Sequence, residues 1–192
     1  MRHHKPKRDW SEILVKISTV VFACTALVTV FITISSWRVQ REAARPYLTF
    51  RESPTVTLDK GVNLELKFTN VGQHPATDLW SRALVIDRSF RGSPVYAKEH
   101  TIVNDIPKDT TSTLLISIAP RSLSPNAGSI APHYLVVFFK YSDPIIKKSY
   151  AQAIYLKWNG EANGQPESLY HVETGEKDKI LAYLKTYKIS VP

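Results

Sequence analysis

The stretch VNLELKFTNVGQHPATDLWSRALVID, residues 62–87, decides the fold class, because its apolar residues follow a period of two. Up to Thr69, apolar and polar residues alternate, as in a strand with one buried face. The run from Thr77 to Asp87 is apolar on both faces, and a turn-rich segment separates it from the first run. The sequence therefore predicts two strands joined by a loop.

The loop carries the turn residues Asn70, Gly72, Pro75 and Ala76. We expect Asn70 and Gly72 to adopt the positive φ angles that a chain reversal needs. Pro75 fixes its own φ after His74 and offers no backbone donor to a sheet. Because no metal-ligand or catalytic spacing surrounds His74, we predict that it is a solvent-facing residue at the loop tip.

Further segments with strand character are separated by turn signals, and they are 46–51, 55–58, 111–119, 133–141 and 149–158. Segment 133–141 is apolar on both faces and is expected at the centre of a sheet. Asp143-Pro144 marks a turn, which predicts a hairpin to the next strand. About seven strands over roughly 110 residues favour an antiparallel immunoglobulin-like β-sandwich. We place this mainly-β domain at residues 46–158.

The run from Ile17 to Trp37 carries no charge. As a helix it is roughly 30 Å long, which matches the hydrocarbon core of a bilayer. The predicted membrane anchors at its ends are Trp10, Lys16, Trp37 and Arg38. A cleaved signal peptide would have a shorter apolar core and a small-residue cleavage site, so we favour a retained transmembrane helix at 17–37. A basic tail (1–16) precedes the span, and a polar stem (38–45) follows it. The stem either continues the helix or forms a separate segment.

The net charge of +8 gathers on both sides of the apolar run rather than on the β domain. We therefore expect contact with the lipid bilayer and its anionic headgroups, and no nucleic-acid binding. Basic residues before and after the run are nearly balanced, so charge alone does not set the orientation. The short N-terminal tail favours a cytoplasmic tail and a periplasmic or extracytoplasmic C-terminal domain.

After Trp158 the sequence becomes polar, and we predict a linker at 159–175. From Glu176 to Lys188, apolar residues recur at helical spacing, which predicts an amphipathic C-terminal helix. We expect this helix to pack on the sandwich or on a neighbouring subunit, with a membrane-surface helix as the alternative. Since residues 77–87 are apolar on both faces, a partner, a sister subunit or this helix has to cover the second face.

The chain resembles a broad set of bacterial membrane-anchored proteins. The features that carry the resemblance are the basic tail, the single span, the sequence RPYLTF after it, and LKFTNVGQHPATDLW. The soluble parts of those proteins look like immunoglobulin-like or fibronectin type III-like sandwiches, including adhesion-related modules with an N-x-G-x-x-P-A strand-end motif. Asn70, Gly72, Pro75 and Ala76 carry that motif here. The resemblance implies a fold and a place in the bacterial inner (cytoplasmic) membrane, but no activity.

Candidate catalytic and metal-binding residues lack the spacing that their chemistry needs. His3-His4 stands in the basic tail without further ligands, and the other histidines show no metal-ligand pattern. The sequence has no GxSxG, SxxK or Cys–His arrangement and no phosphate loop, and its one cysteine, Cys24, lies in the membrane run. We therefore expect no enzyme activity, no cofactor and no metal site.

These observations predict a non-enzymatic single-span membrane protein that presents its sandwich for protein–protein interaction or complex assembly. Its partner would be another protein or a second copy of the chain. The residues expected at the interaction surface are Trp80, Ile180, Leu184 and Tyr187. The alternatives are a sensor that binds a small or anionic ligand through Arg82, Arg88 and Arg91, and an accessory subunit of a membrane enzyme or transporter.

Overall fold

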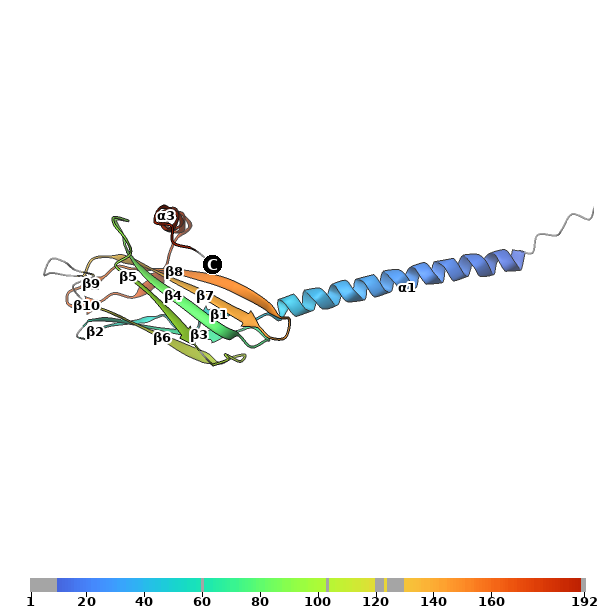
Figure 1. Cartoon of the computed structure of the whole chain (residues 1–192), viewed down its shortest axis with the longest axis horizontal. Coiled ribbons are helices and arrows are strands. Elements are labelled where there is room, and N and C mark those ends of the chain that lie inside the picture. Colours follow the sequence, from blue (N-terminus) through green and yellow to red (C-terminus); the bar gives the residue numbers. More distant parts are fainter. Residues whose placement is uncertain (1–9, 60, 103, 120–122, 124–129, 191–192) are drawn as a thin grey trace, which may run out of the picture. The chain divides into compact units, whose positions relative to one another are not determined.

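The computed structural model describes residues 10–59, 61–102, 104–119, 123 and 130–190. The chain divides into two compact units, Met1–Ala44 and Arg45–Pro192. Figure 1 shows the helix of the first unit and the β-rich second unit. The first nine residues, with most of the predicted basic tail and His3-His4, lie outside the described residues.

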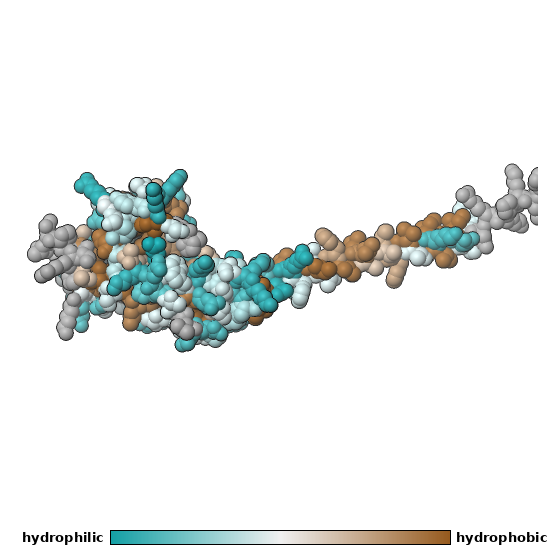
Figure 2. Space-filling model, in the orientation of Figure 1, coloured by the Kyte–Doolittle hydropathy of each residue, from teal (hydrophilic) through white to brown (hydrophobic). Residues whose placement is uncertain are grey.

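The first unit contains a single described helix, α1 (Trp10–Ala43), and none of the residues in that range is buried. It is long and apolar enough to cross a membrane, in agreement with the predicted span. Figure 2 shows the apolar surface that runs along it. All four predicted anchor residues are in this helix and exposed. The polar stem is helical up to Ala43, and the helix ends shortly before Pro46, which disfavours helical geometry in the preceding residue.

Threonine hydroxyls in α1 are satisfied within the helix. Thr25, Thr29 and Thr33 each donate to the carbonyl oxygen four residues earlier, at 2.8–2.9 Å. A hydroxyl in hydrocarbon is costly without such a partner. The internal bonds therefore make this threonine-rich helix compatible with a bilayer.

The second unit consists mainly of two antiparallel sheets (Figure 1). In the first sheet, β3 (Val62–Asn70) pairs along one edge with β6 (Thr111–Ile118). Along the other edge it pairs with β1 (Leu48–Phe50) near its end and with β2 (Thr55–Leu58) near its start. The second sheet has the order β11–β8–β7–β4–β5. Its strands are β4 (Thr77–Asp87), β5 (Tyr96–Ile102), β7 (His133–Asp143), β8 (Lys148–Trp158) and β11 (Leu169–His171).

One apolar core lies between the two sheets. The alternation predicted for β3 is confirmed, since its inward residues Val62, Leu64, Leu66 and Phe68 are buried at 0–2% exposure. They pack against inward residues of β4 and β7, including Leu79, Val85, Leu135, Val137 and Phe139. The ring centroids of Phe68 and Phe139, one from each sheet, are 4.9 Å apart. The centre of the domain is thus an apolar contact between two sheets.

A second apolar cluster lies on the outer face of the second sheet, where α3 (Thr174–Thr186) packs. Ile180 and Leu184 of the helix are fully buried against β4 and β7 residues such as Leu84 and Phe138. The helix therefore covers the second apolar face of β4, one of the three possibilities that the sequence left open. Figure 1 shows the resulting order of layers: α3, the second sheet and the first sheet.

The structure adds strands that the sequence did not predict. β5, with the sequence YAKEHTI, carries charged residues on an outer strand, and its apolar periodicity is weak. The segment 159–175 is not a simple linker: it holds β11 and a small hairpin of β9 (Glu161–Ala162) and β10 (Gln165–Pro166). Leu169 of β11 is buried in the main core, so this segment belongs to the folded unit.

Candidate functional site

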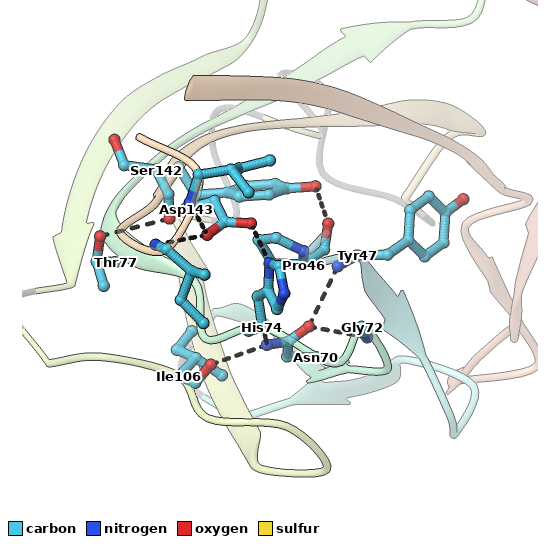
Figure 3. Close-up of polar contacts among 12 residues, drawn as sticks. Pro46, Tyr47, Asn70, Gly72, His74, Thr77, Ile106, Ser142 and Asp143 are labelled. Atoms are coloured by element: carbon cyan, nitrogen blue, oxygen red, sulfur yellow. Dashed lines mark hydrogen bonds and ion pairs between the residues drawn. The ribbon is translucent and has the colours of Figure 1, made fainter. Parts of the chain in front are cut away.

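The loop after β3 is held together by the side chain of Asn70, which is fully buried (Figure 3). Its Nδ2 donates to the carbonyl oxygens of His74 (2.8 Å) and Ile106 (2.9 Å). Its Oδ1 accepts from the backbone N–H of Tyr47 (3.1 Å) and of Gly72 (3.0 Å). The predicted positive φ angle at Asn70 is wrong, because the backbone of Asn70 is not in the left-handed region. Asn70 stabilises the loop through its side chain, which joins three backbone segments.

Gly72 also does not have the predicted positive φ. A Cβ at this position would lie 2.2 Å from the carbonyl oxygen of Arg45 and 2.6 Å from Cα of Pro46. Glycine is needed because two backbone segments approach closely, which is its other common use. Near this loop, the positive φ belongs to Asp78 (52°) of β4, at a β-bulge between Thr77 and Trp80 in the ladder with β7.

His74 is not the exposed loop-tip residue that we predicted. Its side chain is 14% exposed, and its Nδ1 lies 2.7 Å from Oδ2 of Asp143, which is fully buried. The other oxygen of Asp143 accepts from the backbone N–H groups of Ile145 (2.8 Å) and Ile146 (3.2 Å). His74 thus ties the β3–β4 loop to the turn between β7 and β8 (Figure 3). Next to it, Ala76 forms an isolated antiparallel bridge with Ile106.

A second set of polar contacts extends this network to β1 and β8. The hydroxyl of Tyr141 donates to the carbonyl oxygen of Pro46 at 3.2 Å. Burial raises the pKa of Tyr141 to about 12, so the phenol remains a donor near neutral pH. The side-chain amide of Gln152 accepts from the N–H of Leu48 and donates to the carbonyl oxygen of the same residue. The backbone N–H and C=O of Leu48, which point towards β8, are therefore both bonded to the side chain of Gln152.

Beside Gln152, a groove of about 300 Å³ opens between β1, β8 and the start of α3. Tyr47 and Thr49 lie on one wall, and the four consecutive residues 152–155 of β8 form the other. His171 and Lys177 are at the rim formed by the end of β11 and α3. Because neighbouring residues of a strand point to opposite faces, four in succession line a groove only along the backbone edge.

This edge of β8 is unpaired over part of its length. β11 pairs with β8 only at Leu156–Trp158, and the N–H of Val172 adds one bond to the carbonyl of Tyr155 at 3.3 Å. Before Tyr155, no strand in the described ranges pairs with this edge. By the alternation of an antiparallel ladder, the N–H and C=O groups of Ala151 and Ala153 point the same way as those of Tyr155. They point away from β7, and those of Ala153 point into the groove.

The groove is cationic. Lys177 Nζ lies over the ring of Tyr155, 5.2 Å from its centroid, and forms no ion pair with any residue that the structure describes. Arg45 lies 5.4 Å over the ring of Tyr150, further along β8. No aspartate or glutamate is among the described residues that line the groove. Burial raises the pKa of Tyr155, so its hydroxyl is also an un-ionised donor.

The family model described as Domain of unknown function (DUF8453) matches residues 13–161. The chain belongs to this family. No curated protein matches the chain. The DUF8453 match contains α1 from Ile13 onward, the Asn70 network and both strands of the groove, β1 and β8. His171 and Lys177, at the rim of the groove, lie beyond its end.

The structure separates the three arginines proposed for anion binding in this DUF8453 protein. Arg82 is in the middle of β4, 3.9 Å from Glu99. Arg88 lies after β4, 3.4 Å from Glu176 and over the ring of Tyr134. Arg91 is exposed in the following loop. Arg82 and Arg88 are roughly 20 Å apart along the strand direction, so the three do not form one site.

The predicted interaction residues are also divided. Ile180 and Leu184 are fully buried between α3 and the sheet, so they are unavailable while the helix is docked. Tyr187 is 39% exposed and contacts Tyr183. Trp80 and Arg82 do lie together, with Lys140 opposite Trp80 on β7, in a shallow depression that Ser190 also lines. Sequence reasoning missed Lys140, although its place as the one charge in the apolar run HYLVVFFKY was a signal.

The groove itself was not predicted, because its walls come from segments about 100 residues apart. Gln152 and Leu48 are 104 positions apart in the chain. A glutamine in a strand and a lysine on a helix have no local pattern that marks them as a site. Among the described residues there is also no group of three histidine, cysteine or acidic side chains that could hold a metal ion.

Proposed function

We propose that this DUF8453 protein is a non-enzymatic, single-pass protein of the bacterial inner membrane that presents an immunoglobulin-like β-sandwich to bind another protein. In this proposal, α1 is the anchor and the β domain is on the periplasmic or extracytoplasmic side. The observation that carries it is the unpaired edge of β8 at a groove. A free strand edge is a template for another polypeptide rather than for a reaction.

Strand pairing supports the immunoglobulin-like assignment. β3 pairs with β6 in one sheet, as strands B and E do, and β4, β7 and β8 are neighbours in the other, as strands C, F and G are. β5 then corresponds to the additional strand beside C. Such domains are used widely for recognition, but the fold itself does not specify an activity. The argument for binding therefore rests on the groove.

The experiment is site-specific photo-crosslinking in intact membranes with the full-length chain. A benzophenone amino acid replaces Thr49 on the groove wall, Tyr155 on the opposite wall, or Leu115 as a control. Leu115 is 64% exposed on β6, outside the groove. We expect the same protein adduct from Thr49 and Tyr155, and none from Leu115. The absence of an adduct at both groove positions, or an equal adduct at Leu115, would contradict the proposal.

The place in the membrane is tested separately. Alkaline carbonate should leave the full-length chain in the membrane pellet, because α1 is apolar over its length. A reporter enzyme that is active only outside the cytoplasm, fused after Pro192, should be active. Release by carbonate would contradict the anchor, and an inactive reporter would contradict the orientation.

An anionic-ligand sensor remains the second candidate function, and the depression at Trp80, Arg82 and Lys140 is the observation that favours it. Two cations beside an indole suit a carboxylate or phosphate attached to a flat ring. Thermal shift against a panel of aromatic acids and nucleotides tests this candidate. A stabilising ligand whose effect survives Arg82→Glu and Lys140→Glu would refute the site.

A further inference from the structure

We propose that the β8 groove binds an extended segment of a partner protein in which acidic and apolar residues alternate, and that this segment adds to the second sheet as a strand. The inference rests on the proposed function and names the chemistry of the partner. It combines three observations: a strand edge that no described strand pairs with, a groove along that edge, and a cation at the rim with no ionic partner among the described residues.

The edge of β8 sets the conformation of the ligand. Ala153, which lines the groove, and Ala151 just beyond it present two N–H and two C=O groups along the free edge, in continuation of the bonds that β8 makes with β11 and Val172. A strand pairing with both residues needs about five residues, or roughly 17 Å. Main-chain bonds of this kind supply affinity, and alternate side chains supply specificity.

At Leu48, the opposite wall does not compete for the same backbone. The N–H and C=O groups of Leu48, which point from β1 towards β8, are both bonded to the side chain of Gln152. Beside Leu48, a segment that enters the groove therefore finds free backbone groups on β8 and not on β1. We take the segment to be an added strand of the second sheet.

The two faces of the added strand meet different surroundings. On the side of the first sheet, the groove is lined by Thr49, Phe50 and Ile154, and the latter two pack against the main core. On the side of α3, it is lined by Tyr155 and Lys177. Since strand side chains alternate, residues of the first face should be apolar and residues of the second face acidic.

The positive charge of the rim is available. The nearby carboxylates of Glu173 and Glu176 bond to Lys157, and Glu176 also contacts Arg88. Lys177 instead lies over the ring of Tyr155. A carboxylate opposite Lys177 would gain an ion pair in a partly enclosed position, and each such pair typically changes affinity by roughly two- to five-fold.

The chain itself does not supply such a segment. Outside the described residues, the sequence contains one acidic residue, Asp9. The long outer strand of the first sheet, β6, has the sequence TSTLLISI and carries no charge. The outer strand of the second sheet, β5, has the sequence YAKEHTI, with one lysine for its one glutamate. Neither edge of a second copy therefore offers the alternating acidic residues that fit the cationic rim. The charge pattern points to a different protein.

The test measures fluorescence anisotropy with the full-length chain in nanodiscs of zwitterionic lipid. The probe is a fluorescein-labelled ten-residue peptide of alternating glutamate and valine. The comparison peptides alternate lysine and valine, or carry prolines in the centre of the glutamate–valine sequence. We expect the glutamate–valine peptide to bind at least tenfold more tightly than either, with affinity falling as salt is raised.

Two variants of the chain separate the backbone and charge contributions. Ala153→Pro removes an N–H that points into the groove while leaving the ladder with β7 intact, and it should reduce binding at least tenfold. Lys177→Glu should weaken the glutamate–valine peptide about fivefold or more and narrow its advantage over the lysine–valine peptide. Lys185→Glu, in the last turn of the same helix, is the matched control and should have no effect. Circular dichroism of each variant confirms that the fold is retained.

Equal binding of the acidic and basic peptides, no loss with Ala153→Pro, or displacement of the peptide by vesicles of anionic lipid would overturn the inference. It would also be overturned by a Lys177→Glu variant that binds as the parent does. If the Thr49 and Tyr155 adducts form in membranes while the acidic peptide fails to bind, the proposed function stands and only the partner chemistry is wrong.

Discussion

Replacing Asn70 by alanine is the sharpest test of how the domain is held together. The substitution removes four hydrogen bonds of 2.8–3.1 Å from a fully buried position. It leaves the N–H groups of Tyr47 and Gly72 and the carbonyls of His74 and Ile106 without this partner. At a net value of about 1 kcal/mol per bond, the expected loss is about 4 kcal/mol. Typical domain stabilities are about 5–15 kcal/mol, so this is a large fraction.

The assay is urea unfolding of the full-length chain in detergent micelles, followed by circular dichroism in the β-sheet region. Asn63→Ala is the matched control, because Asn63 is on the same strand and its side chain makes one exposed bond of 3.3 Å. Its expected cost is at most about 0.5 kcal/mol. If Asn70→Ala lies within about 1 kcal/mol of the control, the network does not carry the stability assigned to it.

Asn70→Asp checks the direction of the bonds. The new carboxylate keeps the acceptor for Tyr47 and Gly72 but places a negative oxygen against the carbonyls of His74 and Ile106. At neutral pH it should therefore be less stable than Asn70→Ala. Lowering the pH should recover part of the difference, because a protonated carboxyl donates to one carbonyl. Equal stability of the two variants at every pH would show that the assigned amide orientation is wrong.

Four further outcomes follow from the described contacts. Gly72→Ala should lower the free energy of unfolding by about 1–3 kcal/mol, because the new Cβ would overlap the backbone of Arg45 and Pro46. Gly92→Ala has open space around it and should cost only the roughly 1–2 kcal/mol of its positive φ. Parallel urea titrations compare the two variants. Gln152→Leu should cost about 1–2 kcal/mol, because the bonds to Leu48 are lost, and the same titration measures it. The pKa of Glu176 is held below its usual value, first by the N–H of Glu173 and then by Lys157, against the opposing effect of burial. The ionised carboxylate therefore stabilises the fold above pH 4.5, and this stabilisation is lost as pH falls through the lowered pKa. Hydrogen exchange should show α3 losing protection in acid, and Glu176→Gln should remove this pH dependence. Burial lowers the pKa of His133 from 6.5, so as pH falls the unfolded chain takes up the proton before the folded chain does. Stability should therefore fall as pH drops below 6.5, and thermal melting over pH 7 to 5 measures it.

The sequence predicted the strands whose chemistry is local. β3 and β6 alternate cleanly, and β7 is apolar on both faces because the main core and α3 cover it from opposite sides. The hairpin at Asp143 is confirmed too: the carboxylate accepts two backbone N–H groups of the turn, as aspartate commonly does at such a position. α3 was predicted by its spacing of Ile180 and Leu184.

What the sequence did not predict depends on partners that are distant in the chain. His74 and Asp143 are 69 positions apart, so a search for local carboxylate spacing could not find the pair. The turn signals at Asn70 and Gly72 were correct as loop markers but wrong in mechanism. A buried asparagine that bonds three segments, and a glycine against a crossing backbone, have the same sequence signature as positive-φ residues.

The division of the groove between family and chain has a consequence for specificity. The unpaired edge of β8 and the Gln152–Leu48 contact lie within the DUF8453 match, while α3, which brings Lys177 to the rim, lies beyond it. Main-chain pairing at an edge discriminates little between sequences, whereas charge at the rim selects among partners. If the groove binds an extended segment, the sign of charge that it accepts is set by a helix outside the matched region. Docking of α3 through Ile180, Leu184 and Glu176 would then be a requirement for selectivity, separate from the requirement for an open strand edge.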